Sequence, residues 1–362
     1  MTHLFDFVAL SLLPPWCWRR AAERLRAGDA PHAVLRALLD DHWRNEPDKA
    51  STLRSLAAAA IGGAAHNAIT PIPWSDAAYP VALTTIVDPP PVLWTRGGVA
   101  SLSTPAVAIV GSRAASQYGL AVAERLAGDL AARGLVIVSG LARGVDSAAH
   151  RGALAAGGVT VAVLGSGVDV MYPPEHAALA KEIDVRGAVI SELVPGTPPQ
   201  QWFFPLRNRI ISGLSRAVVV IEASDKSGSL ITARCALEQG RDVLAVPGNV
   251  LSGRNRGAHG LLRDGAKIVE SADDILEELG MPEKGAAPLP SDGRRGKGVT
   301  AALPVDPILA CLIPGEACDL DAIAERSGLG TARLLPRLFE LELQGAVARV
   351  GGGRFVRVDR SC

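Results

Sequence analysis

The fold of this chain is decided by residues 106–140, which read AVAIVGSRAASQYGLAVAERLAGDLAARGLVIVSG. A short apolar run rich in β-branched residues, Ala106–Val110, is followed by a helical stretch, Gly119–Arg133, and a second apolar run, Leu135–Val138. Two such runs joined by a helix predict a βαβ unit, in which the helix connects two parallel strands and packs on their sheet.

The same alternation continues well beyond this unit. Further apolar runs of strand length are Val159–Leu164, Ala188–Ile190, Ala217–Ile221 and Val243–Val246. The helical stretches between the runs are Val145–Ala156, Pro174–Ile183, Pro205–Leu214 and Ser229–Gln239. The pattern predicts an α/β fold over residues 105–280, a Rossmann-like doubly wound parallel sheet with helices on both faces.

The flanking sequence has a different character on each side. Residues 1–70 show helical periodicity and predict a small helical domain, and residues 71–104 predict a proline-rich extended strap that supplies no central strand. Residues 281–304 are rich in glycine, proline and charge and predict a flexible linker. Three short helices and a hairpin, which is a winged-helix-like arrangement, are expected in residues 305–362.

Composition limits the class of protein. Of the 362 residues, 48% are hydrophobic and 20% charged, and the formal net charge is zero, so any anion site depends on the local placement of arginines. The five cysteines have no CxxC spacing, and we expect reduced thiols and no metal site. The apolar run Leu10–Trp18 is interrupted by Pro14 and Pro15 and is too short to cross a bilayer. We therefore expect a cytoplasmic protein with no membrane partner.

Glycine, serine and arginine gather where the predicted strands end. The loops concerned are residues 111–113, 139–146, 165–167, 204–209 and 227–232. Backbone amides of such loops approach anions closely, and arginine binds phosphate oxygens in a bidentate manner. Because parallel strands end at one edge of the sheet, we expect Arg113, Arg143, Arg207 and Arg209 to share that edge. Several phosphate-sized sites in a row favour a polymer over a single nucleotide.

The motifs of cofactor binding and catalysis are incomplete. Gly165-Ser166-Gly167 lacks the third glycine of a dinucleotide fingerprint, so no cofactor is expected. His150 has no nucleophile nearby and is expected on a helix surface or in the core, and Asp146 is expected to cap a helix or to orient Arg143. We therefore predict a protein that is not an enzyme. The run Trp202–Phe204 is expected to pack under the sheet edge, with base stacking as the alternative.

The strand-end loops resemble the diagnostic blocks of the DNA-processing protein A (DprA/Smf) family. The similar stretches are residues 110–113, 139–146, 204–214, 227–233, 245–248 and 255–266. A lysine is common in the family where Arg143 stands, a difference that keeps the charge. Relatives often carry a sterile-alpha-motif-like (SAM-like) N-terminal domain, which residues 1–70 match weakly.

The resemblance implies sequence-independent binding and protection of incoming single-stranded DNA, and loading of the RecA recombinase during natural transformation and recombination. It also implies a homodimer. The DNA-binding residues implied are Gly111, Ser112, Arg113, Arg143, Gly144, Ser166, Gly167, Arg207, Asn208, Arg209, Gly228, Ser229 and Thr232. The implied dimer interface includes Leu261, Leu262 and Ile268.

Two other functions remain open. The turn Ser227–Thr232 is similar to that of nucleotide phosphoribohydrolases, but their glutamate three positions after the threonine is Cys235 here. A repressor with a small-molecule sensor would read DNA with the helix predicted at residues 331–343. That helix has only Arg333 and Arg337 as basic residues.

Overall fold

The computed structural model describes residues 3–44, 46–281, 306–312, 316–343, 345–350 and 353–358. By packing, the chain divides into two units, Met1–Lys284 and Gly285–Cys362, each of which is described by itself. The predicted linker, residues 281–304, lies outside the described residues apart from Met281. The finer division of the first unit into residues 1–70, 71–104 and 105–280 stays a prediction.

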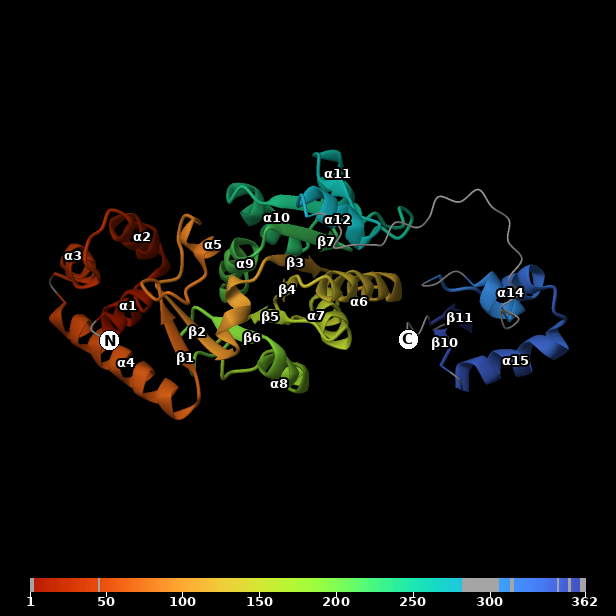
Figure 1. The fold of residues 1–362 in the computed structure, drawn as a ribbon, viewed down its shortest axis with the longest axis horizontal. Coiled ribbons are helices and arrows are strands. Elements are labelled where there is room, and N and C mark those ends of the chain that lie inside the picture. The colour runs from red at the N-terminus through yellow and green to blue at the C-terminus, as the bar shows by residue number, and fades with distance from the viewer. Residues whose placement is uncertain are drawn as a thin grey trace, which may run out of the picture. The chain divides into compact units, whose positions relative to one another are not determined.

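The first unit is built on a nine-stranded sheet with the order β1-β2-β6-β5-β4-β3-β7-β8-β9 (Figure 1). The strands are β1 (Thr70–Pro73), β2 (Val92–Gly97), β3 (Ala106–Gly111), β4 (Val136–Ser139), β5 (Thr160–Val163), β6 (Ala188–Ser191), β7 (Ala217–Ile221), β8 (Asp242–Ala245) and β9 (Lys267–Ile268). In the order of the sheet, all neighbouring strands from β6 through β3 to β9 are parallel, whereas β1–β2 and β2–β6 are antiparallel. The predicted fold class is confirmed.

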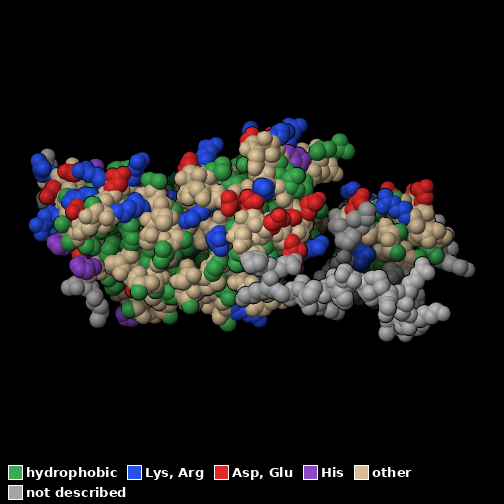
Figure 2. All heavy atoms as spheres, turned by 45° about the horizontal axis from the view of Figure 1, so that its top comes forward, with side chains coloured by type: hydrophobic (Ala, Val, Ile, Leu, Met, Phe, Trp, Pro, Cys, Tyr) green, Lys and Arg blue, Asp and Glu red, His purple; other side chains and the backbone are tan. Residues whose placement is uncertain are grey.

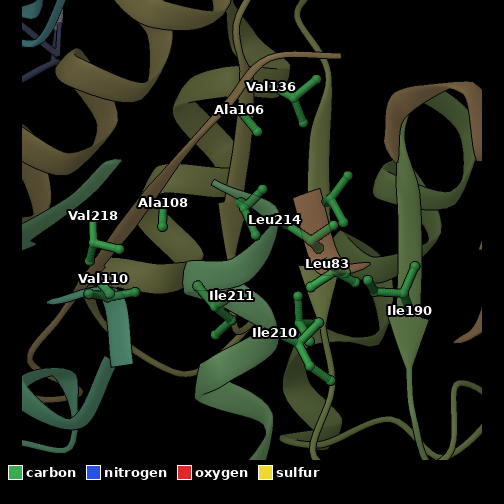
Figure 3. Close-up of a cluster of buried hydrophobic side chains, with 14 of the residues drawn as sticks. Leu83, Ala106, Ala108, Val110, Val136, Ile190, Ile210, Ile211, Leu214 and Val218 are labelled. Carbon is green, nitrogen blue, oxygen red and sulfur yellow. The ribbon is translucent and has the colours of Figure 1, made fainter. Parts of the chain in front are cut away.

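Helices cover both faces because alternate residues of each buried strand point to opposite sides. In β3, Ala108 belongs to the hydrophobic cluster that includes Ile211, whereas Ile109 belongs to the cluster that includes Leu126. Figure 3 shows the first cluster, with Ile210, Ile211 and Leu214 beside strand residues. The helices are α5 (Val81–Thr84), α6 (Gln117–Ala132), α7 (Val145–Ala155), α8 (Ala177–Arg186), α9 (Phe203–Leu214), α10 (Ser229–Glu238), α11 (Arg256–Arg263) and α12 (Ala272–Glu278), with 3₁₀ turns η2 (Val99–Ser103) and η3 (Pro174–His176).

The proline-rich segment supplies more regular structure than the sequence suggests. The expectation that residues 71–104 hold no central strand is wrong, because β2 lies between β1 and β6 and pairs with both. Its six residues contain no proline and can donate every ladder hydrogen bond, whereas Pro71 and Pro73 stand in the edge strand β1.

The helices at the N-terminus form their own hydrophobic cluster on this end of the sheet. They are α1 (Leu4–Ser11), α2 (Trp18–Arg26), α3 (Pro31–Trp43) and α4 (Pro47–His66), with a 3₁₀ turn η1 (Pro15–Cys17). Their cluster includes Trp94 of β2, which is fully buried. The strap and the helical region are thus packed together through β2.

The second unit has three helices followed by a two-stranded hairpin. The elements are α13 (Pro307–Cys311), α14 (Leu320–Ser327), α15 (Thr331–Leu343), β10 (Val347–Val350) and β11 (Arg354–Arg357). Ile323 of α14, Leu338 of α15 and Phe355 of β11 share one hydrophobic cluster. The order of elements agrees with the winged-helix-like arrangement expected from the sequence.

Four cysteines, Cys17, Cys235, Cys311 and Cys318, are free thiols, and Cys362 lies outside the described residues. No helix in the described part of the chain is long and apolar enough to cross a membrane.

Candidate nucleic-acid interface

The loops that follow β3 and β4 touch each other. Gly144 has φ +75°, and a Cβ there would lie 2.2 Å from the carbonyl oxygen of Ser112. Val145 N donates to the same carbonyl at 3.1 Å. Gly111 is equally confined, since its Cβ would lie 1.9 Å from the carbonyl oxygen of Ile221 in β7. Glycine at these positions therefore brings the loops of Arg113 and Arg143 together.

Arg113 and Arg143 are both exposed, but their charges are not equally available. Arg113 forms no ion pair with any residue that the structure describes. Arg143 is paired with Glu175 through its Nε, and this hydrogen bond raises the pKa of Arg143 and lowers that of Glu175. The charge of Arg113 therefore has no ion-pair partner among the described residues, whereas that of Arg143 is paired with Glu175.

Arg207 lies beneath these loops, not among them. It is 5% exposed, and its Nη1 donates to the carbonyl oxygens of Gly140 and Val163. A Cβ at Gly140 would lie 2.1 Å from Nη2, so glycine makes room for the guanidinium. Burial lowers the pKa of Arg207 to about 10, which leaves it protonated at neutral pH. The expectation that Arg207 contacts phosphate directly is therefore corrected: its charge lies behind the loop and supports it.

Asp146 organises the loop after β4. Its carboxylate accepts hydrogen bonds from Gly140 N at 3.2 Å and Ala142 N at 3.3 Å, and lies 3.9 Å from Arg207. Burial raises the pKa of Asp146. The structure shows no bond from Asp146 to Arg143, so the expected orienting role is corrected: it orders backbone amides beside Arg207.

His150 lies in the core, which is one of the two positions expected for it, and not on a helix surface. It is fully buried, and its Nδ1 lies 2.7 Å from the hydroxyl of Thr160. That hydroxyl donates to Ile137 O, so it accepts from Nδ1–H of His150.

Arg209 lies at the carboxyl end of β6, since its partner Glu192 directly follows that strand, but its guanidinium is not exposed for the anion contact that we expected. Residues 207 and 209 both lie in α9, where two positions turn the side chain by about 200°, to the opposite face of the helix. Arg209 is buried and forms ion pairs with Asp88 at 3.0 Å and Glu192 at 2.6 Å. Its guanidinium also lies 5.4 Å from the ring centroid of Trp18, so it joins α9 to the N-terminal helices.

Ser166 and Gly167 are also unsuited to direct contact with DNA. Ser166 is 1% exposed and its hydroxyl donates to Val170 O, while Gly167 N donates to Thr197 O at 2.9 Å. The loop after β5 folds onto the chain near residue 197, and this long-range contact uses the donors that we expected to face an anion.

The start of α10 forms a second part of the candidate edge. Gly228 is exposed, the hydroxyl of Ser229 lies 2.7 Å from that of Ser227, and Thr232 is buried one turn further along. Asn208 connects this loop to α9, because its Nδ2 donates to Gly228 O at 3.4 Å and its Oδ1 accepts from Arg207.

Aromatic rings lie beside Arg113. The Arg113 guanidinium is 5.4 Å from the ring centroid of Phe204, and Phe204 is 5.4 Å from the ring of Tyr172. Tyr172 is 40% exposed and Trp202 52%, so the expectation that residues 202–204 all pack inward holds for Phe203 and fails for Trp202. Tyr172 stands alone in the sequence, so only its position in the fold reveals it.

Positive and negative side chains are mixed on the surface that Figure 2 shows. No single basic field lies on the face that it draws. Because the net charge is zero and the charges are mixed, recognition of an anion depends on the position of a few arginines.

The residues expected at a dimer interface fall into two groups. Leu261 and Leu262 are partly buried and pack against the main hydrophobic cluster, while Ile268 is 57% exposed on the edge strand β9.

In the second unit, α15 exposes Leu335 and Phe339, and Arg337 is paired with Asp306 and Glu340. The side chain of Arg333 lies outside what the structure describes.

Comparisons with known proteins identify the family of the chain. Residues 70–280 match the family model for DNA recombination-mediator protein A, and residues 301–353 match that for the DprA winged helix domain. The chain is 42% identical over 293 residues to Protein Smf of Escherichia coli (strain K12), covering 80% of this chain and 78% of that protein. It is 48% identical over 204 residues to DNA processing protein DprA of Streptococcus pneumoniae, covering 56% and 72%.

Solved structures give the same family. The structure of DNA processing protein A from Streptococcus pneumoniae matches with a TM-score of 0.63 and 38% identity, over 75% of this chain and 95% of that one. DNA processing protein A from Helicobacter pylori, described for its single-stranded DNA binding mode, matches with a TM-score of 0.53 and 30% identity, over 58% and 95%.

Proposed function

Because the chain belongs to the DprA/Smf family of DNA-processing proteins, we propose that it binds single-stranded DNA without sequence preference along the edge that carries Arg113. The observation that carries the proposal is Arg113 itself: an exposed guanidinium without an ion-pair partner among the described residues, between two glycine loops and beside an aromatic ring. The relative from Helicobacter pylori that binds single-stranded DNA supports the choice of ligand.

Each part of the edge has a distinct role in this proposal. Arg113, Arg143 and the amides of the loops around Gly111, Ser112 and Gly144 bind phosphates. Tyr172 and Phe204 stack on bases, which is a contact that tolerates any sequence. Arg207 adds positive charge from below, and the α10 start with Asn208, Gly228, Ser229 and Thr232 extends the path.

Protection of the strand, loading of the RecA recombinase and a role in natural transformation are the finer parts of the proposal, together with a cytoplasmic location. The activity is binding and not catalysis: Cys235 stands where the related hydrolases have glutamate, and burial raises the pKa of its thiol.

The decisive experiment measures binding of a fluorescent thirty-nucleotide oligo-dT at several salt concentrations, against a duplex competitor. Submicromolar, salt-sensitive binding that duplex barely displaces is expected. Absence of binding at low salt would refute the proposal, and hydrolysis of nucleoside monophosphates would then be assayed.

A homodimer through β9 and α11 belongs to the same proposal. Ile268 is exposed on the edge strand, where a second chain can reach both its side chain and the unpaired backbone. Ile268→Glu is expected to give a folded monomer by sedimentation, and a variant that still sediments as a dimer would place the interface elsewhere.

A further inference from the structure

The sheet has a topological switch point at β3. This strand lies between β4 and β7: the chain runs from β3 through β4 and β5 to β6 on one side, and then continues at β7 on the other side. In open α/β sheets ligands bind outside the carboxyl ends of the strands at such a point, and the helix that follows the first strand receives an anion at its N-terminus. In this chain that helix is α6, of sixteen residues.

A carboxylate of the chain itself fills the position at the start of α6. Glu222 follows β7, and its Oε1 and Oε2 accept hydrogen bonds from Ser116 N at 2.9 and 3.1 Å. The Ser116 hydroxyl donates to Oε2 as well and, as the N-cap of α6, accepts from Gly119 N at 3.2 Å. Only 2% of Glu222 is exposed, so the carboxylate is an internal ligand of the helix N-terminus.

The surrounding residues are adapted to this carboxylate. A Cβ at Gly119 would lie 2.5 Å from Oε2, so the absence of a side chain there makes room for it. Glu222 itself has φ +50°, a left-handed conformation that is unfavourable for a residue with a side chain and persists where its surroundings hold it.

Arg254 closes the arrangement from the segment between β8 and α11. Its Nη1 lies 3.7 Å from Oε1 of Glu222 and donates to Ala114 O at 2.9 Å. The loop after β3 is therefore held at Ser116 by Glu222 and at Ala114 by Arg254, with Arg113 directly before these two anchors.

We propose that Glu222 is a positioning residue that takes the place of a bound phosphate at the switch point. Through Ser116 it fixes the loop that presents Arg113, and it denies the start of α6 to the phosphate group of a free nucleotide. Anion binding is thereby confined to the neighbouring part of the edge, where a strand can continue past Arg113. The role of Glu222 in positioning Arg113 rests on the proposed DNA binding, whereas its occupation of the switch point does not.

The occupied position is tested with Glu222→Ala in the full chain, by thermal unfolding during titration with inorganic phosphate at constant ionic strength. Removal of the carboxylate is expected to give a saturable rise of Tm with phosphate that the parent protein lacks, because phosphate then binds the folded state. Glu222→Gln keeps the position filled and is expected to show no rise. Asp274→Ala removes another carboxylate that accepts from backbone amides at a helix start, away from the switch point, and is expected to show none either.

A Glu222→Ala variant that ignores phosphate, or a parent protein that responds equally, would overturn the inference. Should Glu222→Ala not fold, oligo-dT binding by Glu222→Gln decides the positioning role. The amide nitrogen cannot accept from Ser116, so weaker binding with an unchanged salt slope is expected. Tighter binding would mean that Glu222 acts only as a repulsive charge. Failure of the parent to bind oligo-dT would remove the proposed function and leave the phosphate result standing.

Discussion

Replacing Arg113 with alanine is expected to remove one phosphate contact from single-stranded DNA binding. Arg113 is exposed and has no ion-pair partner among the described residues, so the variant loses a charge that no described carboxylate neutralises. A hydrogen bond to a charged group contributes about 1.5–3 kcal/mol net, which is about a 10- to 150-fold loss of affinity. Each neutralised phosphate contributes about 0.7 to the salt slope for single strands, so the loss should shrink about 2.6-fold between 50 and 200 mM salt.

Fluorescence anisotropy with labelled oligo-dT at four salt concentrations measures both quantities. Arg143→Ala is the matched variant, and its loss is expected to be smaller because Arg143 leaves Glu175 to bind. Glu175→Gln frees Arg143 and is expected to tighten binding and steepen the slope. An Arg113→Ala variant with the parent's slope would refute the placement of Arg113 on the DNA path.

Three further predictions concern Tyr172, Arg209 and His150. Tyr172→Ala should weaken oligo-dT binding by about 1–3 kcal/mol with no change in salt slope, since stacking releases no counterions, and a changed slope would contradict the stacking role. Arg209→Met leaves Glu192 buried without its cation and should lower the free energy of unfolding in urea by about 3–5 kcal/mol while leaving the salt slope unaltered. Burial lowers the pKa of His150 to about 3 from 6.5. Between these two pH values the histidine is protonated in the unfolded chain and neutral in the folded chain. The free energy of unfolding therefore falls by about 1.4 kcal/mol for each pH unit from 6.5 down to about pH 3. His150→Gln should remove this contribution to the fall in the free energy of unfolding, measured by urea titrations between pH 6.5 and 4.5. An unchanged pH dependence would show that His150 titrates normally.

The parallel sheet could be predicted because its strands are buried on both faces. Such strands appear in sequence as continuous runs of β-branched residues, and the predicted run Ala217–Ile221 has the same bounds as β7. The strand β2 could not be predicted in the same way, since Pro89–Pro91 stand directly before it and mask a proline-free run of six residues. Its partner β6 comes from a distant part of the chain, and its other partner, β1, contains Pro71 and Pro73 and does not resemble a strand in sequence.

The candidate site was predictable in its loops and less so in its side chains. Glycines that permit close approach are visible in sequence, and the contact between the loops of Ser112 and Gly144 depends on them. The burial of Arg209 could not be predicted, because its partners Asp88 and Glu192 come from distant parts of the chain. Glu222 and Tyr172 carry no local motif, and only tertiary packing brings them to Ser116 and Phe204.

The closeness of Arg207 to Gly140 has an evolutionary consequence. Any side chain at residue 140 would begin 2.1 Å from the guanidinium, so it collides unless residue 207 has already become shorter. Shortening residue 207 first removes the cation that bridges the carbonyl oxygens of Gly140 and Val163. Each single substitution therefore passes through an impaired intermediate, whichever residue changes first. We expect lineages that depart from this pair to change both positions together.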